Sequence, residues 1–496
     1  MRAHRNAILC IAAAATLILA ADVAFAQKVF SRGSSANISA SGPSRGGGGY
    51  YGGGGYRGGG WGGPGVLLAI PQMVPSGGQY IDDGDDVAQG AGRPPQRSTR
   101  RGPSSVPSTN ERRLVPDEVV IEVANSVSPQ QIDALQRRHR LTRIESQTFQ
   151  LSGTTLFRWR IPDRRSVAGV VRALEADRVV ASAQPNYLFA LQQEEGKAVA
   201  EGDAAQYELA KLHLPQAHGL AKGDTVLVAV IDSGVDANHP ELADAVAETY
   251  DTLTAPTALM TPHKHGTAIA GLIAAHGKLM GAAPGAHILA IRAFDGTGAS
   301  AEGTTFNILK GLDWAAAHGA RVINMSFAGP PDPALHRSLE AAHKKGIILV
   351  AAAGNAGPKS PPLYPAADPN VIAVTATDAD DKLFPQANRG RHIAVAAPGA
   401  QILVAIPDGG YEVSSGTSYS AAEVSGIAAL MLERKGGLTP DKVRDILLAT
   451  AKDLGPKGRD VMFGAGLADA YGALMAEEAP MAAMPRPVER ASTGAR

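Results

Sequence analysis

The sequence predicts an α/β protein in which a doubly wound, mostly parallel sheet with helices on both faces follows a small α+β domain. Near-continuous apolar runs recur after about residue 205, and helical stretches lie between several of them. Buried strands that alternate with helices are typical of a parallel sheet covered on both faces. A separate series of strand and helix patterns occupies residues 117–192, and a length of 496 residues favours more than one domain.

The first 26 residues have the pattern of a secretory signal peptide. Two arginines precede an apolar stretch at 7–21, and Ala-Phe-Ala follows at 24–26 as an A-x-A cleavage site. The stretch is shorter than the ~20 residues that a membrane span needs. We therefore expect cleavage after Ala26, a secreted or periplasmic protein, and no transmembrane anchor.

Composition excludes several classes of partner. Lys plus Arg and Asp plus Glu balance at 47 each, so no global charge points to nucleic acid or to a lipid surface. The single cysteine, Cys10, lies inside the predicted signal peptide. The exported chain would therefore contain no disulfide and no cysteine-based metal site.

Residues 27–116 are rich in Gly, Pro and Ser and are expected to be disordered, because such a composition cannot bury enough apolar surface to fold. Glycine interleaved with Arg, Tyr and Trp resembles RNA-binding tracts. A flexible linker fits an exported chain better.

The segment 117–192 predicts a β-α-β-β-α-β order. Strand patterns alternate with two helical ones: DEVVIEVA, SPQQIDALQRRHR, IESQTF, TTLFRWRI, SVAGVVRALEAD and VVASAQPNYLF. This order matches the ferredoxin-like plan, which by itself indicates no function.

Residues 205–475 supply the buried strands of the larger domain. The apolar runs are TVLVAVI (225–231), ILAIRAF (288–294), RVINMS (321–326), GIILVAAA (346–353), VIAVT (371–375) and IAVAA (393–397). In open α/β sheets, active sites gather beyond the carboxyl ends of the strands. Those ends are therefore where functional side chains are to be sought.

Polar residues occur at such ends and at helix starts. Asp232 follows the first run, His265 begins a helix of small residues, Asn355 lies between glycines, and Ser418 opens a buried helix. Each has an ordinary structural interpretation as a turn or capping residue. Together they make a complete set of groups for acyl transfer.

The chemistry assigns a role to each group. Serine is a weak nucleophile until a base such as imidazole removes its proton. A carboxylate on the far ring nitrogen fixes the tautomer and stabilises the imidazolium. The Asn355 amide and the Ser418 backbone N–H can stabilise the oxyanion. The sequence therefore predicts Asp232, His265 and Ser418 as catalytic residues.

These motifs resemble those of subtilisin-like serine proteases over about residues 205–475. The motifs are VIDSGVD, HGTAIAG, INMSFAG, AAGNAG, VAAPG and SSGTSYSAAEVSG, in the order Asp, His, Ser that is found in subtilisin. The resemblance implies a serine endopeptidase with polypeptide substrates. It also implies that residues 117–192 are a prodomain that inhibits its own protease, with processing between about Ala190 and Tyr207. The tail 476–496 is expected to be flexible.

The resemblance further implies where a peptide substrate binds. The segments DGTG (295–298) and SFAG (326–329) would hold an extended chain, and Gly354 would lie near the floor of the primary pocket. The predicted substrate-binding residues are Gly296, Thr297, Gly298, Ser326, Phe327, Ala328 and Gly354. Because Ala328 replaces the usual glycine, we expect uncharged, small to medium apolar side chains before the scissile bond. No cofactor is required; calcium is implied by the family alone, since no loop has decisive ligand spacing.

The sequence also departs from the family pattern. Ala268 replaces the second His of the usual HGTH, and Tyr419 to Glu423 replace Met-Ala-Ala-Pro-His. None of these positions has a catalytic role in the acyl-transfer scheme. The alternative interpretation is a non-catalytic relative that binds or tethers peptides, and an active-site probe would distinguish the two.

Overall fold

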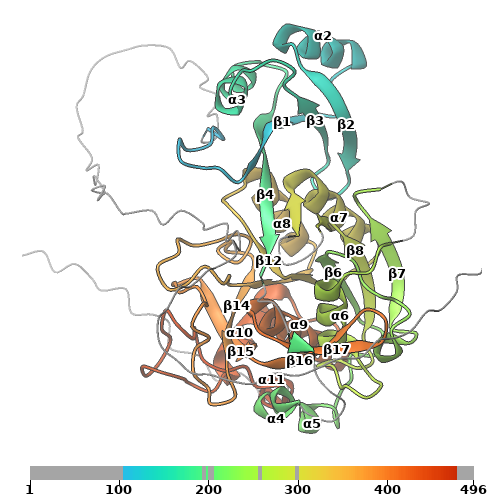
Figure 1. Ribbon diagram of the computed structural model, residues 1–496, viewed down its shortest axis with the longest axis vertical. Coiled ribbons are helices and arrows are strands. Elements are labelled where there is room, and N and C mark those ends of the chain that lie inside the picture. Colours follow the sequence, from blue (N-terminus) through green and yellow to red (C-terminus); the bar gives the residue numbers. More distant parts are fainter. Residues whose placement is uncertain (1–103, 193–196, 199–205, 255–259, 297–300, 477–496) are drawn as a thin grey trace, which may run out of the picture. The chain divides into compact units, whose positions relative to one another are not determined.

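The computed structural model describes residues 104–192, 197–198, 206–254, 260–296 and 301–476 (Figure 1). The predicted signal peptide, most of the segment 27–116 and all of the predicted tail except Ala476 lie outside these residues. Residues 96–496 form one compact unit. Within the part of the chain that the structure describes, no helix combines the length and apolarity needed to cross a membrane.

The N-terminal subdomain, residues 104–192, contains the predicted β-α-β-β-α-β order. Its elements are β1 (Leu114–Val123), α2 (Pro129–His139), β2 (Thr142–Phe149), β3 (Thr154–Arg160), α3 (Val167–Glu175) and β4 (Ser182–Leu191). The sheet is antiparallel in the order β2-β3-β1-β4. Helix α2 begins with a capping box, in which Ser128 Oγ accepts from Gln131 N and Gln131 Oε1 accepts from Ser128 N. A core that includes Ile121, Trp159 and Leu174 fills the space between sheet and helices.

The larger domain is built on a parallel sheet, as the sequence predicts, and this sheet has seven strands. In spatial order the strands are β15 (Ile393–Pro398), β14 (Ile372–Thr377), β13 (Ile348–Ala352), β11 (Val322–Met325), β6 (Leu227–Asp232), β8 (His287–Arg292) and β7 (Val246–Asp251). All neighbouring pairs run parallel. Each predicted apolar run overlaps one of these strands. Strand β7 was not predicted, because its sequence VAETYD has no continuous apolar run.

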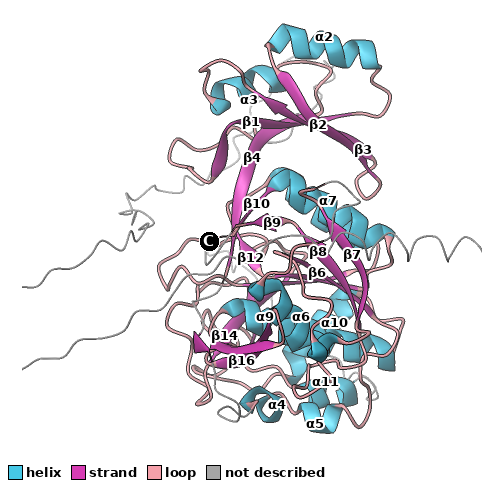
Figure 2. Cartoon of the chain, turned by 45° about the vertical axis from the view of Figure 1, so that its right-hand side comes forward, coloured by secondary structure: helices cyan, strands magenta, loops and turns pink. Residues whose placement is uncertain are grey.

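Helices cover both faces of the parallel sheet (Figures 1 and 2). Along β6, Val228 and Val230 belong to the core cluster that includes α6 (Lys264–Ala274) and α9 (Thr417–Arg434). Ala229 and Ile231 belong to the cluster that includes α7 (Thr305–Ala317) and α8 (Pro333–Lys344). Side chains alternate across a strand, so burial on both faces explains the continuous apolar runs.

Shorter elements surround this sheet. They are β5 (Lys197–Ala198), β9 (Phe294–Asp295), β10 (Glu302–Thr304), β12 (Phe327–Ala328), β16 (Ile402–Ile406), β17 (Gly410–Ser414), the 3₁₀ helix η1 (Pro240–Leu242), α4 (Tyr207–Lys211), α5 (Leu214–Ala217), α10 (Pro440–Thr450) and α11 (Ala470–Ala476).

Strand β4 belongs to two sheets at once. Its first part pairs with β1 of the N-terminal subdomain. Its last residues pair antiparallel with β10 and with β12 of the larger domain. The chain of the N-terminal subdomain therefore ends between two strands of the domain that follows it.

Candidate active site

The four residues predicted to carry chemistry all lie beyond carboxyl ends of strands or at helix starts. Asp232 is the last residue of β6, and His265 is the second residue of α6. Ser418 is the second residue of α9, and Asn355 follows the end of β13. Parallel strands place their carboxyl ends at one edge of the sheet, so this topology gathers the four residues.

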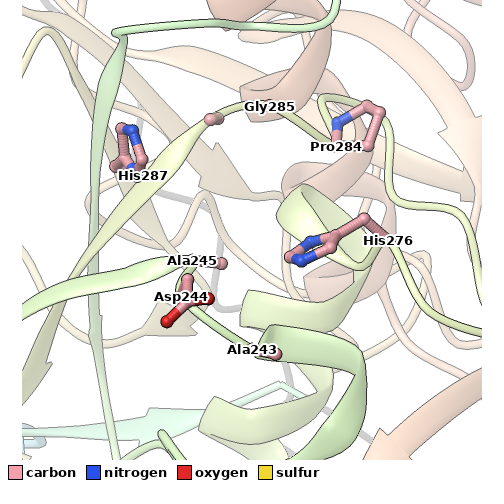
Figure 3. Close-up of a pocket in the computed structure, with 8 residues that line it drawn as sticks. Ala243, Asp244, Ala245, His276, Pro284, Gly285 and His287 are labelled. Carbon is pink, nitrogen blue, oxygen red and sulfur yellow. The ribbon is translucent and has the colours of Figure 1, made fainter.

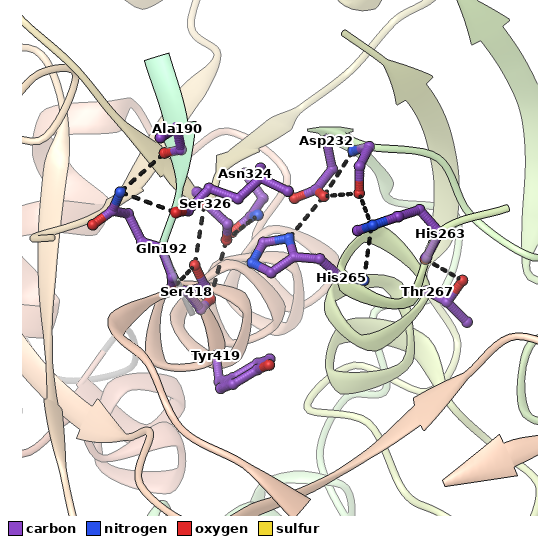
Figure 4. A network of polar contacts seen from close by, with 12 residues as sticks. Ala190, Gln192, Asp232, His263, His265, Thr267, Asn324, Ser326, Ser418 and Tyr419 are labelled. Carbon is purple, nitrogen blue, oxygen red and sulfur yellow. Dashed lines mark hydrogen bonds and ion pairs between the residues drawn. The ribbon is translucent and has the colours of Figure 1, made fainter. Parts of the chain in front are cut away.

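Asp232 and His265 form a fully buried pair (Figure 4). His265 Nδ1 lies 2.7 Å from Asp232 Oδ1, which also accepts from Ser233 N at 2.7 Å. A carboxylate only accepts, so the proton of the neutral ring lies on Nδ1 and Nε2 is left as the acceptor. Among the described residues, His265 Nε2 has no hydrogen-bond partner. The arrangement holds a base with its accepting nitrogen free.

His263 fixes the entry into helix α6. Its Nδ1 accepts from His265 N at 3.4 Å and lies 2.7 Å from Ser233 Oγ. Burial lowers the pKa of His263, so this ring is neutral near pH 7 and can accept at the helix N-terminus. The backbone of His265 is therefore held by His263, while its ring is held by Asp232.

The hydroxyl of Ser418 points at the end of strand β4. It donates to the carbonyl oxygen of Gln192 at 2.6 Å and to that of Ser326 at 3.1 Å. It makes no hydrogen bond to His265, whose Nε2 stays unpartnered among the described residues. In this state the serine and the histidine are therefore not hydrogen-bonded to each other.

A chain of buried polar groups holds the backbone of Ser418. Ser326 Oγ donates to Ser418 O at 3.1 Å, and Asn324 Nδ2 donates to Ser326 Oγ at 2.9 Å. Ser425 Oγ in turn donates to Asn324 Oδ1 at 3.0 Å. Buried polar networks of this kind rigidify a site when their members are satisfied.

Asn355 presents its amide nitrogen without a partner. Its Oδ1 accepts from Thr417 N at 3.1 Å and from Thr417 Oγ1 at 2.9 Å. A backbone N–H can only donate, so this contact identifies the oxygen and leaves Nδ2 as the free donor. Nδ2 is buried and has no partner among the described residues. Gly354 makes the turn at φ +106°, where an added Cβ would lie 2.5 Å from Asn388 Nδ2.

Strand β4 lies against three of the residues that the sequence predicts to bind a peptide. Phe327 and Ala328 pair with Leu191 and Ala190 in antiparallel register, and Ser326 O accepts from Gln192 N at 3.4 Å. Three predicted substrate-binding residues therefore contact the extended chain. Gly354 lies next to Asn355, whose backbone N–H donates to Gln192 Oε1 at 2.9 Å.

The second predicted segment is described only at Asp295 and Gly296, and neither of these residues pairs with β4. Gly296 follows β9, which pairs with β10 and not with β4, while Thr297 and Gly298 lie outside the described residues. The strand that pairs with β4 on this side is β10, Glu302–Thr304, and Ala301 O accepts from Leu191 N at 3.4 Å. The sequence did not indicate β10, because three residues carry no readable periodicity.

Phe189 of β4 is buried among aromatic side chains. Its ring meets Phe327 edge to face, with centroids 5.9 Å apart, and the Phe327 ring lies 4.9 Å from Phe294. At Gly329 an added Cβ would lie 2.3 Å from the Phe189 ring. Glycine at 329 therefore leaves the space that this ring fills.

Two of the departures from the family pattern at helix α9, Tyr419 and Glu423, place large side chains in buried positions. The Tyr419 hydroxyl donates to Ser414 Oγ at 2.9 Å, and its ring centroid lies 6.3 Å from that of His265. Glu423 is 1% exposed, and burial together with the charge of Glu208 raises its pKa well above the ordinary value. The helix thus accommodates a bulkier ring and an acid without losing its start at Thr417.

A separate cavity of about 210 Å³ lies elsewhere on the domain (Figure 3). It is lined by Ala243, Asp244, Ala245, His276, Pro284, Gly285, Ala286 and His287. None of these residues belongs to the cluster around Ser418, so this cavity has no part in the acyl-transfer chemistry.

Comparison with known proteins identifies the family. A model of the Subtilase family matches residues 223–466. Thermitase of Thermoactinomyces vulgaris is 35% identical over 274 residues, which is 54% of this chain and 95% of that protein. Subtilisin E of Bacillus subtilis (strain 168) is 36% identical over 270 residues, 53% of this chain and 69% of that protein.

A solved structure agrees with these relatives. The crystal structure of fervidolysin from Fervidobacterium pennivorans, described as a keratinolytic enzyme related to subtilisin, matches with a TM-score of 0.61 at 25% sequence identity. The match covers 73% of this chain and 61% of that one, which is less than two thirds of its length. With thermitase covered almost entirely at 35% identity, this chain belongs to the subtilase family of serine proteases.

Proposed function

We propose that the chain is a self-processing endopeptidase in which Ser418 is the nucleophile, His265 the general base and Asp232 the group that orients His265. The observation that carries the proposal is the buried Asp232–His265 hydrogen bond, which leaves His265 Nε2 as an unpartnered acceptor. In the reaction the Ser418 hydroxyl turns from Gln192 O towards Nε2 and gives up its proton there. Asp232 stabilises the imidazolium that results.

Asn355 is proposed as the donor to the oxyanion. Thr417 holds the amide oxygen, so the orientation of Nδ2 is set before any substrate arrives. A buried amide N–H without a partner is unfavourable in the resting site and becomes satisfied when a negatively charged oxygen forms nearby. The Ser418 backbone N–H at the start of α9 is the second proposed donor.

Residues 117–192 are proposed as a prodomain that inhibits the protease on the same chain. Support comes from β4, which pairs with both β10 and β12 and brings Gln192 to Ser418. Further support comes from buried contacts outside the cleft. Gln184 Nε2 donates to Asp332 Oδ1 at 2.7 Å, and the Leu151 backbone N–H donates to Asp313 Oδ1 at 2.7 Å. A strand added between two edges blocks the approach of another peptide.

Export with removal of residues 1–26 is proposed from the sequence pattern of that segment. It is consistent with polypeptide substrates outside the cell and with a chain whose protease is held inactive until processing. The proposed processing lies between about Ala190 and Tyr207, as the sequence predicts.

The proposed mechanism uses side chains and backbone groups of this chain alone. Among the described residues, no His, Cys, Asp and Glu side chains form a group of three or more that could hold a metal ion. Calcium prefers six to eight oxygen ligands with several carboxylates. No step of the proposed mechanism involves a metal ion.

An active-site fluorophosphonate probe tests the proposal. The processed protein should be labelled on Ser418 and should hydrolyse casein, and the Ser418→Ala protein should do neither. A folded, secreted protein that binds peptides but is never labelled would instead be the non-catalytic tether.

A further inference from the structure

We infer that the first self-cleavage falls directly after Gln192, and that the protease recognises a glutamine side chain at the residue before the scissile bond. The inference rests on the proposed function and specifies the substrate class of the same site. On the basis of Ala328, the sequence analysis expects a small to medium apolar side chain before the scissile bond. The present inference places an uncharged carboxamide side chain there instead.

The position of the bond follows from the hydroxyl of Ser418. It lies 2.6 Å from the carbonyl oxygen of Gln192. The preceding carbonyl oxygens, of Ala190 and Leu191, accept instead from the side-chain amide of Gln192 at 3.0 and 3.1 Å. Gln192 is thus the residue of this strand whose carbonyl group lies within reach of the nucleophile.

The backbone of each residue from Ala190 to Gln192 is paired with or hydrogen-bonded to the larger domain. Leu191 N donates to Ala301 O at 3.4 Å and Gln192 N donates to Ser326 O at 3.4 Å. Ala190 pairs with Glu302 on one side and with Ala328 on the other. A chain fixed on both edges has one register, and that register sets the carbonyl group that meets Ser418.

The covalent step balances as an acyl transfer. Ser418 Oγ bonds to the carbonyl carbon of Gln192, and its proton passes to His265 Nε2. The bond from that carbon to the nitrogen of residue 193 breaks, and His265 returns the proton to the leaving amine. Water then attacks the ester, gives one proton to His265 and leaves Gln192 as a carboxylate while Ser418 regains its hydrogen.

Both ends of the Gln192 side chain are used. Its Oε1 accepts from the backbone N–H of Asn355 at 2.9 Å, and its Nε2 donates to the carbonyl oxygens of Ala190 and Leu191. Methionine has nearly the same length but offers neither interaction. Glutamate could accept from Asn355 but would bring a charged oxygen against two carbonyl oxygens.

The preferred class of substrate is therefore an extended segment with glutamine before the cut. A neutral hydrogen bond is worth about 0.5–1.5 kcal/mol, so we expect Gln to exceed Met by roughly 3–10-fold in kcat/KM. Glutamate lacks the amide donor, and its charged oxygen would be repelled by the two carbonyl oxygens. Its kcat/KM should therefore be lower than that of glutamine by roughly 10-fold or more.

The first test uses the full-length chain, folded without other proteases and stopped in acid at short times. The mass of the N-terminal fragment should place its end at Gln192 in the wild type. Gln192→Met and Gln192→Glu should slow its appearance by the factors expected for kcat/KM. Gln150→Met, the same substitution at an exposed glutamine of a turn, should process at the wild-type rate. An earliest fragment that ends elsewhere, or equal rates for all variants, would overturn the inference.

The second test needs no variant to fold. The processed enzyme is given chromogenic peptides Phe-Ala-Leu-X with X as Gln, Met or Glu, and kcat/KM should fall in that order. A preference for Met over Gln would sink the specificity claim. If the probe labels Ser418 and casein is cleaved while Gln is not preferred, this inference alone fails. If Ser418 is not labelled at all, the proposed function fails with it.

Discussion

At the residue scale, the site combines an Asp232–His265 pair that is already hydrogen-bonded with a Ser418 hydroxyl that donates to Gln192 O instead of to His265. Asp232, His265 and Asn355 could be found from the sequence because each follows an apolar strand or begins a helix at the edge where parallel sheets place their sites. The direction of the Ser418 hydroxyl could not be found. It depends on Gln192, a residue 226 positions away that reaches the site through an antiparallel pairing. Local sequence patterns carry no signal for such a contact.

The amide of Asn355 gives a prediction at this scale. Asn355→Ala should lower kcat by roughly 10²–10³, the magnitude known for removing one such donor in subtilisin, with little change in KM. The reason is that Nδ2 has no hydrogen-bond partner among the described residues. We expect it to gain one only when the oxyanion forms. Steady-state kinetics on a peptide substrate measure both constants.

Asn238→Ala provides the matched control for Asn355→Ala, because Asn238 is exposed in a loop. It should leave both constants unchanged. A normal kcat in Asn355→Ala would show that Asn355 forms a turn but does not stabilise the oxyanion.

At the element scale, helices α4 and α9 each carry a buried acid, and the charge of the acid on α4 acts on the acid on α9. Glu208 on α4 is fully buried and Glu423 on α9 is 1% exposed, and each has one carboxylate oxygen without a partner among the described residues. Burial raises the pKa of Glu208 to about 7 and that of Glu423 well above its ordinary value. The sequence indicated that Glu423 lies early in a helix. It did not indicate that this side chain is buried, because the burial depends on segments that are distant in the sequence.

These acids make stability depend on pH. The folded state keeps protons that an unfolded carboxyl, with a pKa of about 4.5, has released. The contribution of these two acids to the free energy of unfolding should therefore be fully present below about pH 4.5 and should fall as the pH rises to about 7. Urea unfolding of Ser418→Ala, which cannot digest itself, should show this fall.

The substitutions Glu208→Gln and Glu423→Gln, made in the Ser418→Ala chain, should flatten that dependence. Glu248→Gln, at an exposed position of β7, should leave it as it is. An equal slope in all of these proteins would show that the two carboxyl groups bind protons equally in the folded and unfolded states.

At the scale of the whole molecule, strand β4 joins the N-terminal subdomain to the larger domain, because it pairs with strands of both. The element orders of the two parts could be predicted because each has its own periodicity of apolar residues. Their contact could not, because residues such as Gln184 and Asn186 look like ordinary polar positions of a strand. In the structure both are buried, and Asn186 Oδ1 accepts from the first turn of α7 at Phe306 N.

Loss of the nucleophile gives the prediction for the whole chain. Ser418→Ala should accumulate as a folded precursor that has lost only its signal peptide, keeps residues 117–192 and hydrolyses neither casein nor peptides. Removing a mere helix cap would cost at most ~0.5–2 kcal/mol of stability and would leave processing unchanged. Masses of the secreted proteins decide between the two: wild-type maturation of Ser418→Ala without other proteases would contradict the assignment.

Strand β4 pairs antiparallel with β10 and with β12. A substrate that binds in the same place must therefore have an extended backbone. A segment held there offers its backbone N–H and C=O groups to the walls on both sides. In a folded protein those groups are already hydrogen-bonded within a helix or a sheet. The segment must therefore unfold locally before it can bind. Cleavage of folded targets would then follow the equilibrium of local opening, and sites that exchange amide hydrogens fastest would be cut first.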